Sequence, residues 1–340
     1  MQRKVLGVIV SANGFGHLRR QLEIASELLQ RNTNLHINLA LTESQYRRFF
    51  HWIREFGSRV TTFPGLTENS PQWRTTARDF TDKNLSGWLS EFQRNNAFME
   101  SDNVLSDNLG EILACRPDAW LSGSFLWSDV LDCYSSENKS CCTFVIRERQ
   151  LLSRFQPQML ANQFLLTPGV RSYTAAVLIG WIFREPETPK PRNRNNILMV
   201  GGGTKSLQDL ISQLTLRLRR LGFIVTSDLA NDENPFDFSE ESWASVGLIV
   251  CRPGVGTLTE SVKWRIPALM IPEETNSEIS HIVKRMSSLN KAAVLPSPLE
   301  LSDSELRKQI QRAVRTTNPV QFQSGRAGLQ QAVEWIERNL

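Results

Sequence analysis

The 340-residue chain carries one local pattern twice: a short apolar run, a glycine-rich turn and an amphipathic helix. The first copy is the run at 5–10 with Gly14 and Gly16 after it, and the second is the run at 196–200 with the glycines of 201–203 after it. Short continuous runs of apolar residues that favour strands are typical of strands buried on both faces of a parallel sheet. Such sheets bind ligands at the loops that follow their strands. We therefore expect an α/β protein with two Rossmann-like, doubly wound domains that face each other across a cleft.

The first copy continues as a βαβ unit. A helix with leucines on one face follows the glycines, and residues 35–41 form the next apolar run. This order implies parallel pairing through a right-handed crossover. Two later runs, 119–121 and 142–146, are predicted as further strands of the same sheet, and Glu148 after the second run either faces the cleft or is solvated.

A proline-rich segment separates the two copies. Residues 184–196 contain three prolines and no large apolar residue, which is typical of a linker. We place the first domain at 1–185, the linker at 186–195 and the second domain at 196–340, with a last helix that can pack back on the first domain. The second domain is predicted to continue with strands at 223–226, 246–251 and 268–271.

Composition excludes some classes of function. Lys and Arg total 39 against 35 Asp and Glu, a formal net charge of +4, and no basic run is long enough to follow a phosphate backbone. We therefore expect no nucleic-acid partner. The five cysteines are an odd number at spacings that fit neither a disulfide framework nor a zinc site, as expected for a cytoplasmic protein without a metal.

The apolar runs of the chain are too short for membrane insertion. The run at 5–10 is too short for a signal-peptide core, and the run at 175–183 is far below the ~20 residues that span a bilayer. Residues 44–59 combine arginines with aromatic residues. Such a segment either makes a peripheral contact with the anionic inner face of a membrane or forms an ordinary surface helix with its aromatic side chains packed inward.

The first candidate site follows the first predicted strand. Gly14 and Gly16 allow a sharp turn between strand and helix, and His17 then lies at the helix N-terminus. There it can take a proton from a hydroxyl group or a water molecule, or else it only caps or packs the helix. The dinucleotide fingerprint GxGxxG is not present, because Arg19 occupies the third glycine position.

Two further glycine turns belong to the second domain. Gly202, Gly203 and Thr204 precede a helix, so their backbone can approach a diphosphate closely, although a plain strand-to-helix turn is the alternative. The segment 251–260 joins a buried strand to a helix. Glu260, one turn into that helix, can accept two ribose hydroxyls or is a solvated glutamate favoured by the helix dipole.

These segments together resemble the GT-B nucleotide-sugar glycosyltransferase superfamily, in particular the family 28 type that forms lipid II from UDP-N-acetylglucosamine. Within 251–272, CRPGVGTLTE followed by two prolines is similar to the donor-binding signature of that family, with Arg265 where glycine is usual. The start of the family, GxGHxxR, is similar to residues 14–20. The other similar elements are 116–118, 179–184 and 201–203.

The resemblance implies a role for each candidate residue. By this resemblance His17 is the catalytic base or a residue on the acceptor side. Glu260 would bind the ribose, and Arg252 would help to neutralise the charge of the diphosphate. The diphosphate would be held by Gly202, Gly203, Thr204, Gly256 and Thr257. The glycines that shape the site would be Gly14, Gly16 and Gly254.

One stretch departs from the family. Where the family carries an acidic or amide residue followed by glutamine for the sugar hydroxyls, residues 273–281 of this chain contain no glutamine. Glu274, Asn276 and Glu278 are the candidates to replace that pair. Neither the sugar nor the base is assigned by this sequence.

The implied activity is the transfer of a hexosyl or hexosaminyl group from a nucleotide diphosphate sugar, expected to be UDP-linked, with inversion and without a metal or other cofactor. The acceptor is a lipid-linked or a small molecule. Two alternatives stay open. One is a UDP-sugar hydrolase of a sialic-acid-like pathway, in which His17 activates water, and the other is a non-catalytic nucleotide-sugar-binding protein, which the missing glutamine favours.

Overall fold

The computed structural model describes residues 3–73, 79–186, 195–202, 205–229, 232–273, 275–289, 292–316 and 325–340. The chain forms two compact units, one of Met1–Phe183 with Gly325–Leu340 and the other of Arg184–Ser324. Most of the predicted linker, 187–194, lies outside the described residues. None of the helices within those ranges is long and apolar enough to cross a membrane.

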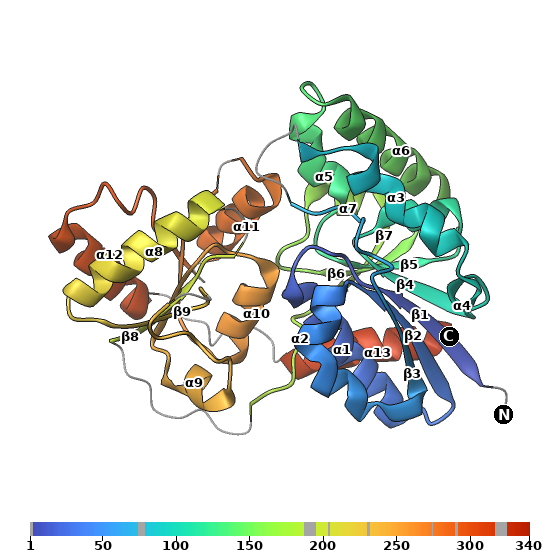
Figure 1. Cartoon of the computed structure of the whole chain (residues 1–340), viewed down its shortest axis with the longest axis horizontal. Coiled ribbons are helices and arrows are strands. Elements are labelled where there is room, and N and C mark those ends of the chain that lie inside the picture. Colours follow the sequence, from blue (N-terminus) through green and yellow to red (C-terminus); the bar gives the residue numbers. More distant parts are fainter. Residues whose placement is uncertain are drawn as a thin grey trace. The chain divides into compact units, whose positions relative to one another are not determined.

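The first unit is built on a parallel sheet in the order β3-β2-β1-β4-β5-β6-β7 (Figure 1). β1 pairs with β2 on one side and with β4 on the other, so the strand order reverses between β1 and β4. The loops after these two strands therefore lie at the edge where such sheets bind ligands. The strands are β1 (Lys4–Ile9), β2 (Leu35–Leu41), β3 (Val60–Pro64), β4 (Asn103–Asp107), β5 (Trp120–Gly123), β6 (Gln158–Asn162) and β7 (Ala175–Ile179).

Helices cover both faces of this sheet, and each face has its own hydrophobic core. One core includes residues of α1 (Phe15–Arg31), α2 (Glu43–Glu55) and α13 (Gly325–Asn339). The other includes residues of α3 (Asp82–Gln93), α4 (Asn96–Met99), α5 (Trp127–Leu131), α6 (Lys139–Phe155) and α7 (Pro168–Tyr173). Short 3-10 helices lie at Gly57–Arg59, Gly110–Ala114 and Asp132–Tyr134.

The last helix, α13, packs on the first unit from the far end of the sequence. The rings of Trp335 and Trp120 meet edge to face with centroids 4.9 Å apart. A Cβ on Gly328 would lie 2.1 Å from the carbonyl oxygen of Trp181, so this contact requires glycine. α13 therefore packs directly against the backbone of Gly180 and Trp181, the residues that follow β7.

One predicted strand is wrong. Residues 142–146 lie inside α6, whose buried side chains recur at the spacing of three and four that one helix face requires. A short apolar run cannot by itself distinguish a strand from a buried helix. Asn138 caps the helix by accepting the N–H groups of Ser140 and Cys141. Glu148 is therefore buried within a helix, neither facing a cleft after a strand nor solvated.

The second unit has a smaller parallel sheet in the order β12-β11-β10-β8-β9. Four of its strands match the predicted runs: β8 (Asn196–Val200), β9 (Ile224–Ser227), β10 (Leu248–Cys251) and β11 (Ala268–Met270). The fifth, β12 (Ala293–Val294), was not predicted. The helices of this unit are α8 (Lys205–Arg220), α9 (Glu240–Ser245), α10 (Val255–Lys263), α11 (Ser277–Ser288) and α12 (Asp303–Thr316). Because β8 lies between β9 and β10, the loops after β8 and β10 flank the switch point of this sheet.

Candidate functional site

The loop after β1 is held in one conformation. Gly14 has a φ of 95°, which residues with a Cβ rarely adopt, and α1 begins directly after it. The side chain of Gln45, in α2, donates to the carbonyl oxygens of Ser11 and Gly14 at 2.8 and 2.9 Å. Gly16 and His17 are thereby placed in the first turn of α1.

His17 contacts a carboxylate from a different strand. Its Nδ1 lies 2.8 Å from Oδ2 of Asp107, the last residue of β4. Because β4 pairs with β1, the end of β4 lies beside the loop from which α1 starts. Arg20, one turn further along α1, donates to Oδ1 of the same carboxylate. The sheet therefore assembles a histidine, an aspartate and an arginine at its carboxyl edge.

Asp107 is fully buried and ionised. Burial alone would raise the pKa of this carboxyl, but the charges and hydrogen bonds of Arg20 and His17 outweigh it and hold the pKa below its ordinary value. An ionised carboxylate only accepts hydrogen bonds, so Nδ1 of His17 carries a hydrogen, and in the neutral form of the imidazole Nε2 keeps its lone pair. The His17 side chain is 14% exposed. Its Nε2 can therefore take a proton from a neighbouring group.

Sequence reasoning named His17 and missed Asp107. The segment that ends in Asp107 reads NVLSD and is followed closely by a single glycine, Gly110, and not by the paired glycines seen in the other turns. The available signal was an acidic residue at the end of an apolar run, but such residues are common. Only the pairing of β4 with β1 shows that this carboxylate meets the histidine.

The second unit brings two of the predicted glycine turns together. β8 and β10 pair in register up to Val200 and Cys251, and the N–H of Arg252 donates to the carbonyl oxygen of Val200 at 3.1 Å. Gly202 has a φ of 61°. Gly203 and Thr204, predicted to hold a diphosphate, lie outside the described residues.

An aspartate supports the turn after β8. Its first glycine, Gly201, donates its N–H to Oδ1 of Asp228 at 2.9 Å. Burial raises the pKa of Asp228, and the hydrogen bond from Gly201 opposes the rise. Sequence reasoning did not identify this residue, which follows β9.

The helix α10 starts at the turn after β10. Gly254 is its N-cap residue, and no side chain caps the helix there. Gly256 and Thr257 lie in its first turn, where backbone N–H groups have no partner within the helix. These groups and the positive end of the helix dipole favour an anionic ligand.

Glu260 lies one turn into α10 and is only 7% exposed. Its Oε2 accepts the indole N–H of Trp264 at 3.1 Å. The ring of Trp264 is nearly parallel to that of Trp243, with the ring centroids 6.4 Å apart. The carboxylate is thus positioned by an aromatic pair. It is not the solvated glutamate that was the alternative.

The remaining predicted residues already have partners or lie outside the described ranges. Nε of Arg252 donates to Oε2 of Glu273 at 2.5 Å, so part of its charge is balanced within the unit. Asn276 is 1% exposed and caps α11 by accepting the N–H of Ile279 at 3.1 Å. Glu274 lies outside the described residues.

No protein-family model matches the sequence, and neither does any curated protein. Solved structures match along nearly the whole chain. The spinosyn forosaminyltransferase SpnP has a TM-score of 0.62 and 13% identity, over 100% of this chain and 99% of that one. MurG of Acinetobacter baumannii has a TM-score of 0.57 and 14% identity, over 99% of each chain. A UDP-glucose:anthocyanidin 3-O-glucosyltransferase in complex with UDP has a TM-score of 0.61 and 14% identity, also over 99% of each.

These similarities concern the fold. The matched structures are GT-B glycosyltransferases, and they align with both parallel-sheet units of this chain. At the level of the fold, the expectation of two doubly wound domains of the GT-B type is therefore confirmed. The resemblance to the fold of this superfamily, of which MurG is one example, is confirmed as well.

Proposed function

We propose that this chain is a glycosyltransferase that moves a sugar from a nucleotide diphosphate sugar to a hydroxyl group of an acceptor. The observation that carries the proposal is the contact of His17 with buried, ionised Asp107, which leaves Nε2 of the histidine ready to act as a base. Two of the structural neighbours are named for sugar transfer, and one of them is bound to UDP. That ligand supports a UDP-linked donor here.

In the proposed reaction, the acceptor oxygen attacks the anomeric carbon of the donor sugar. The acceptor proton passes to Nε2 of His17, and the bond from the anomeric carbon to the leaving diphosphate breaks. Asp107 stabilises the imidazolium that forms. Direct attack opposite the leaving group inverts the configuration at the anomeric carbon.

The second unit would bind the donor. Negative charge builds up on the diphosphate as it leaves, and we propose that the N–H groups at the start of α10 stabilise it together with Arg252. In this scheme Glu260, positioned by Trp264, accepts the ribose hydroxyls. The turn at 201–204 would hold the rest of the diphosphate. The scheme uses fixed dipoles and a guanidinium and needs no metal ion.

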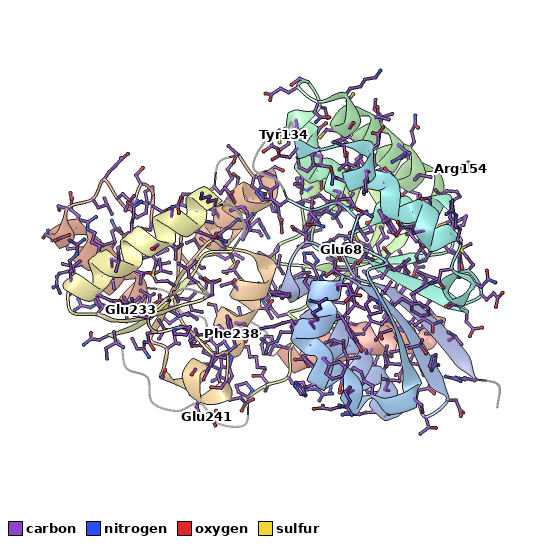
Figure 2. The ribbon with its side chains drawn as sticks, viewed as in Figure 1. Glu68, Tyr134, Arg154, Glu233, Phe238 and Glu241 are labelled. Atoms are coloured by element: carbon purple, nitrogen blue, oxygen red, sulfur yellow. The ribbon has the colours of Figure 1, made fainter. Side chains whose placement is uncertain are left out.

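An aromatic group offers a surface for the base of the nucleotide. Phe238, labelled in Figure 2, precedes α9 and is 38% exposed. Its ring meets Phe236 edge to face at 5.0 Å, and Phe236 packs in the same way on Trp243. We propose that this cluster, which lies within the donor-binding unit, receives the base.

The acceptor side is proposed to be the first unit, and its α2 is consistent with a lipid-linked as well as a small-molecule acceptor. Phe15 is 48% exposed and lies 6.2 Å from the ring of Phe49 in α2, where Arg47 is largely exposed. Other α2 residues are buried: Ile53 belongs to the hydrophobic core. We propose a cytoplasmic protein whose α2 makes peripheral contact with the inner face of the membrane. Sedimentation with anionic vesicles tests this contact, and no binding by the full chain would refute it.

The proposed activity is tested with purified protein and UDP-sugars, with and without candidate acceptors. Acceptor-dependent release of UDP supports the transferase. Rapid release of UDP and free sugar without an acceptor would show the hydrolase instead, and donor binding without any turnover would show a binding protein.

The role of His17 is tested by His17→Ala, with His51→Ala as a matched control, because His51 is exposed on α2. We expect His17→Ala to lower turnover by about 10²-fold or more, the usual effect of a lost general base, and to leave UDP affinity unchanged. Turnover that survives in His17→Ala would remove this residue from the mechanism.

A further inference from the structure

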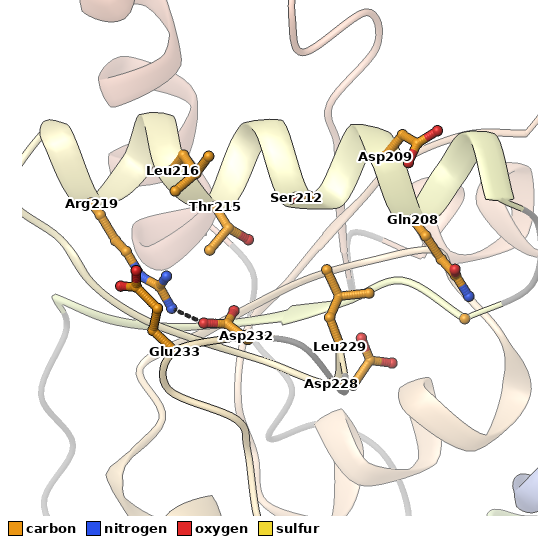
Figure 3. Close-up of a pocket in the computed structure, with 11 residues that line it drawn as sticks. Gln208, Asp209, Ser212, Thr215, Leu216, Arg219, Asp228, Leu229, Asp232 and Glu233 are labelled. Carbon is orange, nitrogen blue, oxygen red and sulfur yellow. Dashed lines mark hydrogen bonds and ion pairs between the residues drawn. The ribbon is translucent and has the colours of Figure 1, made fainter.

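A groove of about 570 Å³ runs along α8 in the second unit (Figure 3). One wall is a stripe of α8 that includes Asp209, Thr215 and Arg219, and the other is the segment that follows β9. Gly202 also lines the groove, so the groove adjoins the turn after β8.

The groove is acidic. Asp209, Asp228, Asp232 and Glu233 line it, and Arg219 is the basic residue among the described residues of its lining. Arg219 pairs with Asp232 at 2.5 Å. Within the described part of the chain, the other three carboxyl groups have no cationic partner. An anion such as a diphosphate is therefore repelled from this groove, whereas a cation is attracted.

A second and independent observation points to a ligand. Thr215 is 2% exposed and lines the groove, and its Oγ1 has no hydrogen-bond partner in the structure described. Buried hydroxyl groups are almost always hydrogen-bonded, because leaving one without a partner costs its full desolvation. Figure 3 shows Thr215 below α8, on the side of Asp232 and Leu229. A donor group placed in the groove would satisfy this oxygen.

We propose that the groove binds a small aliphatic amine with two or more protonated amino groups. The ammonium groups offset the charges of Asp209 and Glu233, and one of them donates to Oγ1 of Thr215. The methylene groups between them lie against Leu216 and Leu229, which also line the groove. This site adjoins the proposed nucleotide-sugar site, because Gly202 of the diphosphate turn and Asp228, which supports Gly201, also line the groove.

The probe for this proposal is spermidine, titrated calorimetrically into the full chain at low ionic strength. We expect one saturable site. Thr215→Val keeps the shape of the side chain but removes the oxygen, so we expect it to weaken binding roughly fivefold, the effect of one hydrogen bond. Glu233→Gln should weaken binding at least as much, because the lost partner is charged.

The control is Glu241→Gln, an exposed glutamate of α9 that does not line the groove; Figure 2 labels both glutamates. This variant should bind spermidine as the unaltered chain does. The proposal is overturned if no saturable binding occurs, or if Thr215→Val and Glu233→Gln bind as tightly as the control. UDP titrated into the same variants reports on the donor site separately, so failure of one site is not mistaken for failure of the other.

Discussion

Replacing Glu148 by glutamine tests how a buried carboxyl controls the stability of the first unit. Glu148 is fully buried in α6, its Oε2 accepts the backbone N–H of Ser128 at 2.5 Å, and its Oε1 has no partner among the described residues. The pKa of this carboxyl is raised from 4.5 to about 8, chiefly by burial; the charges of Glu111 and Asp129 contribute to the rise and the hydrogen bonds of Ser128 oppose it. The folded protein therefore keeps the proton of Glu148 at pH values where the unfolded chain has lost it.

The sign of the effect follows from proton binding. Between pH 4.5 and 8 the folded state holds one more proton at Glu148 than the unfolded state, so the free energy of unfolding falls as the pH rises. The slope is about 1.4 kcal/mol per pH unit, which amounts to about 3 to 4 kcal/mol between about pH 5 and pH 8. Glutamine is neutral throughout and can still accept the N–H of Ser128. The difference in unfolding free energy between Glu148→Gln and the unaltered chain should therefore shift in favour of the variant by that amount as the pH rises from about 5 to 8.

The assay is urea denaturation at several pH values between 5 and 8, with hydrogen exchange of α6 peptides to assign the transition to the first unit. His36, whose pKa is lowered, is present in both proteins and is not among the groups that shift Glu148, so its effect cancels in the difference. Glu137→Gln, at an exposed glutamate just before α6, is the control and should show no such trend. A difference in unfolding free energy that stays constant with pH would refute the reasoning.

Three further outcomes are expected. Asp107→Asn should lower turnover by roughly 10²- to 10⁴-fold, because the asparagine leaves the histidine without its anionic partner, and UDP binding measured by calorimetry should not change. Glu260→Ala should weaken UDP binding by about 10-fold or more in the same titration, and unchanged affinity would contradict a ribose contact. Gly328→Ala should lower the midpoint of thermal unfolding, because its Cβ would lie 2.1 Å from the carbonyl oxygen of Trp181. Gly87→Ala, whose Cβ would meet only side-chain atoms at 3.4 Å or more, should be neutral by comparison.

Local patterns in the sequence were enough to predict two parallel-sheet α/β domains, although they did not reveal β3, β4, β6, β7 or β12. The apolar runs at 5–10 and 35–41 and the series that restarts at 196–200 appear as parallel strands, with only the ends shifted by a residue or two. Gly14 also follows from sequence, because a sharp turn between strand and helix calls for glycine. These features depend on periodicity and backbone conformation within a few residues, and such information is local.

Pairings between distant residues needed the tertiary structure. Asp107 and His17 are 90 residues apart, and they meet only because β4 pairs with β1 in a particular register. The same holds for Asp228, which supports Gly201 from the end of the next strand. The run at 142–146 was misassigned because a short apolar run fits a strand and a buried helix equally well, and only the wider spacing of the buried residues along α6 distinguishes the two. The sequence by itself thus determined the α/β class, the two repeated units and the places where glycines open their helices. The order of the strands in each sheet decided which side chains meet at the strand ends.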